Sequence, residues 1–158
     1  MNLVIVESPA KAKTINKYLG SDYTVLASYG HIRDLPSKNG SVDPENNFKM
    51  VWEIDSFSQR YLKEITDSAK DSSKIILATD PDREGEAIAW HVKEFLKEKK
   101  LLKDKKVERV VFNEITKKAV TKGIDNPRQI ETELVDAYMA RRALDYLVGF
   151  NISPNIMD

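Results

Sequence analysis

The sequence contains no cysteine, which excludes disulfide bonds, thiolate catalysis and metal sites held by cysteine. Long hydrophobic runs are also absent: stretches such as residues 3–6 and 75–78 are far too short to cross a bilayer. No basic stretch followed by an apolar run and a cleavage site opens the chain, so we expect no secretory signal. The formal net charge is zero, because 25 Lys and Arg balance 25 Asp and Glu. Such a balance argues against a nucleic-acid partner, unless the two signs gather in different places.

What is present is typical of a globular protein. Of the 158 residues, 41% are hydrophobic and 32% are charged, a composition that excludes disorder for most of the chain. The length suits one α/β domain, or one domain and the start of a second, with enough residues for a buried core.

Strand-like and helix-like segments alternate along the chain. Apolar runs at 3–6 and 74–79 are typical of parallel strands covered on both faces. Ser8 and Pro9 supply an N-cap and a first-turn proline for a helix that Gly20 ends. The alternation predicts an α/β fold with a Rossmann-like, mostly parallel sheet and helices on both faces. Strands are expected at 3–6, 23–27, 49–54, 74–79 and 108–113, helices at 10–19, 58–70, 83–100, 117–123 and 131–148, a loop at 28–48 and irregular structure at 151–158.

Acidic residues follow two of the predicted strands. Glu7 ends the first, and Asp80 and Asp82 follow the strand at 74–79, with Glu84 and Glu86 close behind. Ligands in such sheets bind beyond the C-terminal ends of the strands, so neighbouring strands would bring these acids together. Carboxylate oxygens are ligands that Mg²⁺ selects, and phosphoryl-transfer sites use that ion to neutralise charge on the phosphate.

Each of these residues also has an ordinary structural interpretation. Acids at a helix start stabilise the helix dipole, and Thr79 and Asp82 fit a capping box. The crowding of four acids into seven positions nevertheless exceeds what capping requires, and like charges repel unless a cation offsets them. Without neighbouring acids, Glu7 would be interpreted as a solvated residue at the end of a strand. Lys11 is either a solvated lysine or a phosphate contact at a helix N-terminus.

Five motifs together resemble the bacterial type IA DNA topoisomerase I family. The Glu-Ser-Pro-Ala-Lys form of the first motif favours topoisomerase I over topoisomerase III, and the resemblance covers essentially the whole chain in order. The motifs are VESPAKAKTI at 6–15, YGHIRDLP at 29–36, ATDPDREGEAIAWH at 78–91, RVVFNEIT at 109–116 and ARRALDYLVGF at 140–150.

The resemblance implies a Toprim domain at 1–125 and, at 126–158, the beginning of a helical strand-binding domain. Glu7 matches the family's acid/base and metal-proximal glutamate, and Lys11 the lysine at the scissile phosphate. Asp80, Asp82 and Glu84 match its Mg²⁺ acidic triad. Arg83 matches a residue that assists the reaction, with an ion pair to a neighbouring acid as its alternative. Arg109 and Glu114 match a charged pair near the site, which an ordinary salt bridge explains almost equally well.

DNA contacts are implied at two places. His31 and Arg33 lie in the second motif, and His31 would otherwise read as an exposed loop residue. Arg141, Arg142 and Asp145 match contacts to single-stranded DNA, although Arg141 and Asp145 are four apart and suit a helical ion pair. Phe150 stands where a tyrosine is common, and would stack on a base or pack in a core. The end, Ser-Pro-Asn-Ile-Met-Asp, departs from the family's usual Ser-Pro-Leu-Leu-Trp.

The family's reaction relaxes negatively supercoiled DNA by transient cleavage of one strand through a 5′-phosphotyrosine, strand passage and religation. None of the six tyrosines lies in the family's nucleophile motif, so we expect this chain to be an N-terminal part that is inactive alone. The expected partners are a single-stranded segment of supercoiled DNA and the remaining domains of the same enzyme. We expect a monomer, no membrane contact, and a cytoplasmic, nucleoid-associated location. The alternatives are a stand-alone Toprim nuclease or primase and a non-catalytic DNA-binding module.

Overall fold

The computed structural model describes residues 1–35, 41–43, 49–54 and 56–157, with side chains through Gly149. Its centre is a four-stranded parallel sheet in the order β2-β1-β7-β8. The strands of this sheet are β1 (Asn2–Val6), β2 (Tyr23–Ala27), β7 (Lys74–Leu77) and β8 (Lys106–Arg109). The helices are α1 (Pro9–Leu19), η2 (Ser56–Ser58), α2 (Gln59–Lys70), α3 (Arg83–Glu98), α4 (Lys117–Asp125) and α5 (Thr132–Met157).

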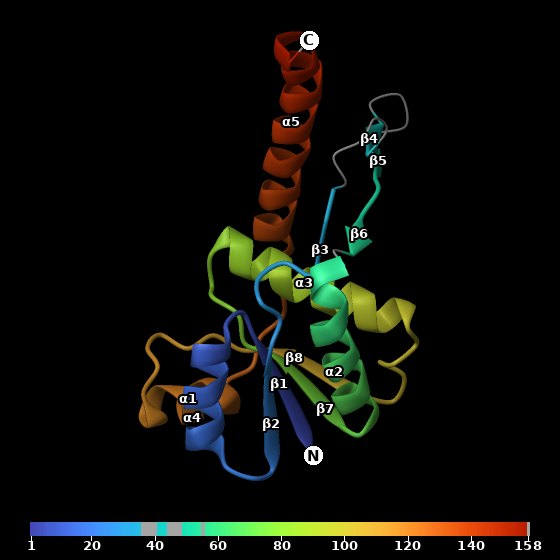
Figure 1. The fold of residues 1–158 in the computed structure, drawn as a ribbon. Coiled ribbons are helices and arrows are strands. Elements are labelled where there is room, and N and C mark those ends of the chain that lie inside the picture. Colours follow the sequence, from blue (N-terminus) through green and yellow to red (C-terminus); the bar gives the residue numbers. More distant parts are fainter. Residues whose placement is uncertain (36–40, 44–48, 55, 158) are drawn as a thin grey trace.

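Alternation along the strands divides the core between the two faces of the sheet, as the sequence predicted. Leu3, Ile5 and Leu77 face one side with buried residues of α2 and α3. Val4 and Ile76 face the other side with buried residues of α1 and α4. Figure 1 shows the two pairs of helices on opposite sides of the sheet. Each inner strand is therefore covered on both faces, which explains its unbroken apolar sequence.

The first helix begins and ends where its local signals lie. Ser8 caps α1, its Oγ accepting a hydrogen bond from the Lys11 backbone N–H, and Pro9 is the first helical residue. Gly20 follows with a φ of 84°, a conformation that suits glycine.

Four sequence predictions were wrong in detail. The strand expected at 49–54 is two short strands in different antiparallel ladders, β5 (Lys49–Met50) against β4 (Val42–Asp43) and β6 (Glu53–Ile54) against β3 (Arg33–Asp34). The loop expected at 28–48 therefore supplies β3 and β4. The strand expected at 108–113 begins and ends earlier, at 106–109, because it pairs in register with β7. The segment expected to be irregular from 151 continues α5 to Met157, since no glycine that would end the helix follows Phe150 and Pro154 does not stop it.

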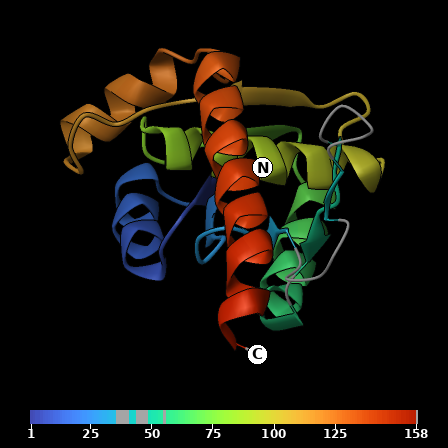
Figure 2. The same ribbon diagram turned by 90° about the horizontal axis from the view of Figure 1, so that it is seen from above.

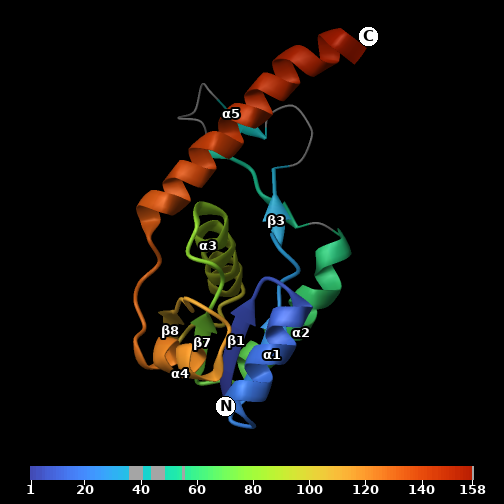
Figure 3. The same ribbon diagram turned by 90° about the vertical axis from the view of Figure 1, so that its left-hand side faces the viewer.

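Helix α5 packs on α3 and extends beyond the sheet beside the short ladders. Leu35 and Val42 pack with Ala143 and Tyr146 of α5 in a small separate core. Figures 2 and 3 show the helix as one long rod that leaves the domain near α4 and passes over α3. Within the described residues, no helix combines the length and the apolar character that crossing a bilayer requires.

Candidate functional site

Glu7 and Asp80 meet at the C-terminal ends of the neighbouring strands β1 and β7. Glu7 Oε2 accepts a hydrogen bond of 2.7 Å from the Asp80 backbone N–H. The Lys11 ammonium lies between the two acids, 2.9 Å from Glu7 Oε1 and 2.7 Å from Asp80 Oδ1. Burial lowers the pKa of Lys11, but hydrogen bonds to Asp80 and Glu7 outweigh it and raise the pKa above its ordinary value. The lysine thus stays charged and holds the two strand ends together.

The loop between β7 and α3 is fixed by short-range hydrogen bonds. Asp82 is the N-cap of α3, and its Oδ1 accepts a hydrogen bond of 2.7 Å from the Gly85 N–H. Thr79 Oγ1 donates to the Gly85 carbonyl at 2.6 Å, so it does not form the capping box expected with Asp82. A Cβ on Gly85 would lie 1.9 Å from the Asp80 carbonyl oxygen, which explains why glycine stands inside the acidic cluster.

A buried ionic network supports this loop from behind. Arg109 is 1% exposed and contacts the fully buried Glu86 carboxylate at 2.6 Å, while its guanidinium also donates to the Thr79 and Asp80 carbonyls. Arg128 adds a second contact to Glu86 at 3.0 Å. Burial raises the pKa of Glu86, but hydrogen bonds from Arg109 and Arg128 outweigh it and lower the pKa to about 2. The salt bridge that was the alternative explanation for Arg109 and Glu114 does not form: Arg109 pairs with Glu86, and Glu114 contacts Thr116.

Glu84 and Arg83 begin α3 beside the acids. Glu84 is exposed, and its carboxylate lies 3.7 Å from His31 Nε2. His31 Nε2 also lies 3.0 Å from the Tyr138 hydroxyl of α5, and the two rings stack. Burial lowers the pKa of His31 despite the nearby Glu84, so the ring is neutral at pH 7. The exposed Arg83 side chain makes no hydrogen bond or ion pair within the part of the chain that the structure describes.

The donors suit a hard cation, although they are not gathered around one point. Glu7 and Asp80 already hold one positive charge, the Lys11 ammonium, through carboxylate oxygens. Asp82 is occupied by the helix cap, and Glu84 lies toward His31. Among the described residues, no group of three or more Asp, Glu or His side chains converges closely enough to hold a metal ion. Mg²⁺ often takes only one or two carboxylates and completes its shell with water and phosphate oxygens, so the residues fit that mode of binding.

Arg33 is placed inside the molecule rather than at the strand ends. It is 8% exposed, its Nε donates to His91 Nδ1 at 2.7 Å, and it forms an ion pair of 3.2 Å with Glu98. Its guanidinium also lies 5.5 Å from the centre of the Trp90 ring. These contacts give Arg33 a packing role, and its contact with DNA stays a prediction.

On α5, the predicted DNA-binding residues form ion pairs. Arg142 makes a two-pronged contact with Asp34, at 2.7 and 2.9 Å. Arg141 pairs with Asp145 at 3.0 Å on the exposed helix surface, which confirms the pairing that their spacing suggested. The side chain of Phe150 lies outside the described residues.

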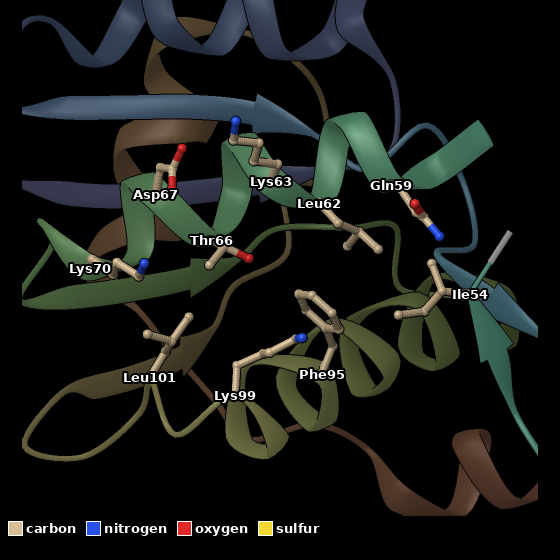
Figure 4. A pocket seen from close by; sticks show the side chains of 10 residues that line it. All are labelled: Ile54, Gln59, Leu62, Lys63, Thr66, Asp67, Lys70, Phe95, Lys99 and Leu101. Atoms are coloured by element: carbon tan, nitrogen blue, oxygen red, sulfur yellow. The ribbon is translucent and has the colours of Figure 1, made fainter. Parts of the chain in front are cut away.

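A groove of about 560 Å³ lies elsewhere, between α2 and α3 (Figure 4). Lys63, Lys70 and Lys99 line it together with apolar residues such as Leu62 and Phe95. None of the acids at the strand ends contributes to its wall. The candidate site is instead an open surface at the end of the sheet.

Several residues that shape this surface are not apparent from the sequence. Arg128 carried no signal, because it follows the Asn-Pro boundary far from the acids. Tyr138 and Asp34 contact predicted site residues across 107 and 108 positions of sequence, a separation that no local pattern reveals. Gly85 alone had a detectable signal, a glycine within a run of charged residues at a helix start.

The fold and these residues define a class: a Rossmann-like parallel α/β domain with carboxylates at the ends of its central strands. Residues 2–115 match the family model of the Toprim domain. The chain belongs to the Toprim family, and the Rossmann-like fold predicted from the sequence is confirmed.

Relatives and a solved structure extend the match over nearly the whole chain. The chain is 66% identical over 154 residues to DNA topoisomerase 1 of Zymomonas mobilis, which covers 98% of the chain and 13% of that protein. It is 62% identical to DNA topoisomerase 1 of Xylella fastidiosa, covering 97% of the chain and 19% of the relative. Full-length topoisomerase I from Thermotoga maritima matches with a TM-score of 0.84 and 42% identity, over 98% of this chain and 26% of that one. The chain therefore spans a fifth or less of the two relatives' length.

Proposed function

We propose that this chain is the Toprim region of a type IA DNA topoisomerase, which relaxes negatively supercoiled DNA by cleaving and rejoining one strand. The observation that carries the proposal is the Glu7–Lys11–Asp80 arrangement at the strand ends, in a chain that matches proteins named DNA topoisomerase 1 over nearly its whole length. The proposal assigns the nucleophilic tyrosine to a part of the enzyme that this chain does not contain.

The reaction needs an acid/base and a cation beside the phosphate. A tyrosine hydroxyl gives up its proton to water and attacks the phosphorus, the bond to the 3′ oxygen breaks, and Glu7 supplies the proton which that oxygen takes up. In religation Glu7 removes the proton again, and the tyrosine leaves. Lys11 lies 2.9 Å from Glu7 and, once released from Asp80, stabilises negative charge on the scissile phosphate. Arg83, at the adjacent start of α3, helps to hold the leaving or attacking group.

Mg²⁺ is the proposed cofactor, held by Glu7, Asp80, Asp82 and Glu84 together with water. When bound, the ion supplies positive charge against phosphate oxygens. His31, Arg33, Arg141, Arg142, Asp145 and Phe150 are the proposed contacts to a single-stranded segment of the DNA. Arg142 would exchange its Asp34 partner for a phosphate there.

A chimeric enzyme tests the proposal. This chain replaces the matching 154 residues of the Zymomonas mobilis topoisomerase, and relaxation of a negatively supercoiled plasmid is measured with Mg²⁺. We expect relaxation, and a fall of about 10²- to 10⁴-fold in Glu7→Gln, the usual contribution of a general acid/base. Glu133→Gln, the same change at an exposed glutamate of α5, is the control and should keep full activity. An inactive chimera with intact folding, or an active Glu7→Gln enzyme, contradicts the proposal.

Metal binding is tested on the chain itself by titration calorimetry with Mg²⁺. Lys11→Met removes the ammonium that competes for Glu7 and Asp80, so the affinity should rise, whereas Asp80→Asn should lower it. Lys13→Met is the matched control and should leave the affinity unchanged. An unchanged affinity in both site variants means that the ion binds elsewhere.

Assays of the chain alone, compared with those of the chimera, distinguish the other functions. Nicking of plasmid DNA by the chain alone favours a Toprim nuclease, and Mg²⁺-dependent strand binding without any activity in the chimera favours a DNA-binding module. Relaxation by the chain alone contradicts the assignment of the nucleophile to another region.

A further inference from the structure

Three aromatic rings and one guanidinium form a column on the surface beyond β2. Tyr29 stacks on Tyr61 with ring centres 3.7 Å apart and planes 19° apart. Phe57 meets the Tyr61 ring edge-on at 5.8 Å. The Arg60 guanidinium lies 5.0 Å from the centre of the Tyr61 ring and donates to its hydroxyl at 2.9 Å. Tyr29 follows β2, Phe57 lies in η2, and Arg60 and Tyr61 lie in the first turn of α2; we call these four residues the aromatic column.

The column is exposed, which is unusual for aromatic rings in contact. Tyr29 is 44% exposed and Phe57 is 69% exposed. Large aromatic side chains are normally the main contributors to a buried core. The separation of Tyr29 and Tyr61 is also shorter than the usual spacing of aromatic pairs in proteins and is close to the rise of about 3.4 Å between stacked bases.

The backbone is strained at the exposed end of the column. Tyr29 has a φ of 58°, a left-handed conformation that is rare for a bulky residue, and Gly30 follows with a φ of 85°. Strained backbone positions of this kind cluster at active and ligand-binding sites, where the surrounding structure keeps the residue in its strained conformation. The strain therefore presents the Tyr29 ring outward from the end of β2.

The column adjoins the proposed catalytic surface. The Gly30 N–H donates to the Glu7 carbonyl at 3.1 Å, so Tyr29 is one residue away from a direct link to the acid/base. Tyr29 also lines a groove of about 470 Å³ beside α1, together with Pro9, Lys13 and Glu64. Lys13 thus lines the groove beside Tyr29, and Arg60 lies over the neighbouring Tyr61 ring, against one acid, Glu64, in the groove wall.

We propose that the aromatic column is a stacking platform for an unpaired base of single-stranded DNA, with Tyr29 as the ring that the base covers. The inference rests on the proposed function. It adds a DNA contact near the start of α2, separate from the contacts expected on α5. A base on Tyr29 continues the existing stack at the same spacing, and Arg60 and Lys13 supply positive charge for the adjoining phosphates.

The test uses the chain with short oligonucleotides at low salt. One oligonucleotide carries a dye for anisotropy, and a series carries 2-aminopurine at successive positions, whose fluorescence is quenched by stacking. We expect one position to be quenched by the wild-type chain. Tyr29→Gly suits the left-handed backbone and should abolish that quenching and weaken binding by about 5- to 100-fold, the range for one base stacked on an aromatic ring. Tyr29→Phe keeps the ring and should bind within about twofold of wild type.

Salt dependence separates stacking from charge. Tyr29→Gly should leave the slope of affinity against salt concentration unchanged, whereas Arg60→Gln should reduce it by about 0.7 if Arg60 contacts one phosphate. Tyr61→Leu removes the support of the stack and should reproduce the loss seen in Tyr29→Gly. Circular dichroism confirms that each variant is folded before binding is compared.

The opposite outcomes overturn the inference. Unquenched 2-aminopurine with the wild-type chain, or equal affinity of Tyr29→Gly and wild type, means that bases do not stack there. If Tyr29→Gly instead lowers the thermal stability but leaves oligonucleotide binding unchanged, the column is a structural contact and not a DNA site. Relaxation by the wild-type chimera in the same experiments keeps the proposed function intact, so the two ideas fail separately.

Discussion

At the scale of single residues, Gly85 has the sharpest consequence. A methyl group there meets the Asp80 carbonyl oxygen, a backbone atom that cannot move without displacing the acidic loop. Gly85→Ala should therefore lower the free energy of unfolding by about 3 kcal/mol, the upper part of the ordinary range for one substitution. The measurement is urea unfolding followed by circular dichroism.

Gly149→Ala is the matched control, because it is the same change in the helix α5 with no neighbouring atom within 4 Å. It should stabilise the chain by about 0.5–1 kcal/mol, since alanine favours the helix. Equal effects at the two glycines would show that the close approach at Gly85 does not exist in solution.

His91 makes stability dependent on pH. It is fully buried, and burial together with the Arg33 guanidinium lowers its pKa to about 3 from an ordinary value of 6.5, with His31 adding to the shift and Asp34 opposing it. Below pH 6.5 the unfolded chain takes up a proton that the folded chain refuses until about pH 3. The free energy of unfolding should therefore fall on acidification by about 1.4 kcal/mol per pH unit from this residue alone.

The comparison is urea unfolding of wild type and His91→Gln between pH 7.5 and 5. Glutamine keeps an acceptor for Arg33 Nε but does not titrate. The free energy of unfolding of the His91→Gln variant should therefore change less with pH than that of wild type, by about 1.4 kcal/mol per pH unit. Parallel curves for the two proteins would place the pH dependence elsewhere.

Among the elements, the C-terminus of α2 is capped by the side chain of a single residue from outside the helix. The Lys105 ammonium donates to the Ala69 carbonyl at 2.6 Å and also contacts the carbonyls of Lys70 and Ser72. A cation at the C-terminus of a helix satisfies free carbonyls and opposes the negative end of the dipole. Lys105→Met should lower the free energy of unfolding by about 1–2 kcal/mol, whereas the exposed Lys103→Met should change it by less than about 0.5 kcal/mol.

The elements that the sequence predicted well are those with local signals. The run at 23–27 and the cap of α1 coincide with the observed β2 and with the helix start, because a short run of residues that favour strands and a capped helix have signals in adjacent residues. The split of 49–54 could not be predicted, since β5 and β6 exist only through pairing with β4 and β3. The meeting of Glu7 and Asp80 followed from the order of parallel strands, but the partner of Arg109 did not, because two acids were available and only packing selects Glu86.

At the scale of the whole molecule, α5 is attached to the loops by an ion pair that spans the sequence. Arg142 and Asp34 are 108 positions apart and form two hydrogen bonds. A double-mutant cycle with Arg142→Gln and Asp34→Asn should give a coupling energy of about 1 kcal/mol, because the contact is two-pronged although the Asp34 side chain is 56% exposed. Hydrogen exchange should also become faster along α5 in either single variant.

The exposed pair Arg141 and Asp145, which lies within one helix, is the control for this cycle. Its coupling should be about 0.3–0.5 kcal/mol, the usual value for such helical pairs. Equal coupling in the two cycles would mean that the contact between α5 and the loops contributes no more than a surface ion pair.

The Glu86 carboxylate joins two parts of the molecule that a domain boundary near residue 126 would separate. Its oxygens accept hydrogen bonds from Arg109, which holds the acidic loop, and from the backbone N–H of Glu131, just before α5 begins. The first turn of α5 and the loop that carries Asp80 and Asp82 thus share one rigid anchor. The start of α5 therefore cannot shift without disturbing the carboxylate that holds the acidic loop, and the contact of Tyr138 with His31 links a later turn of the helix to Glu84 as well.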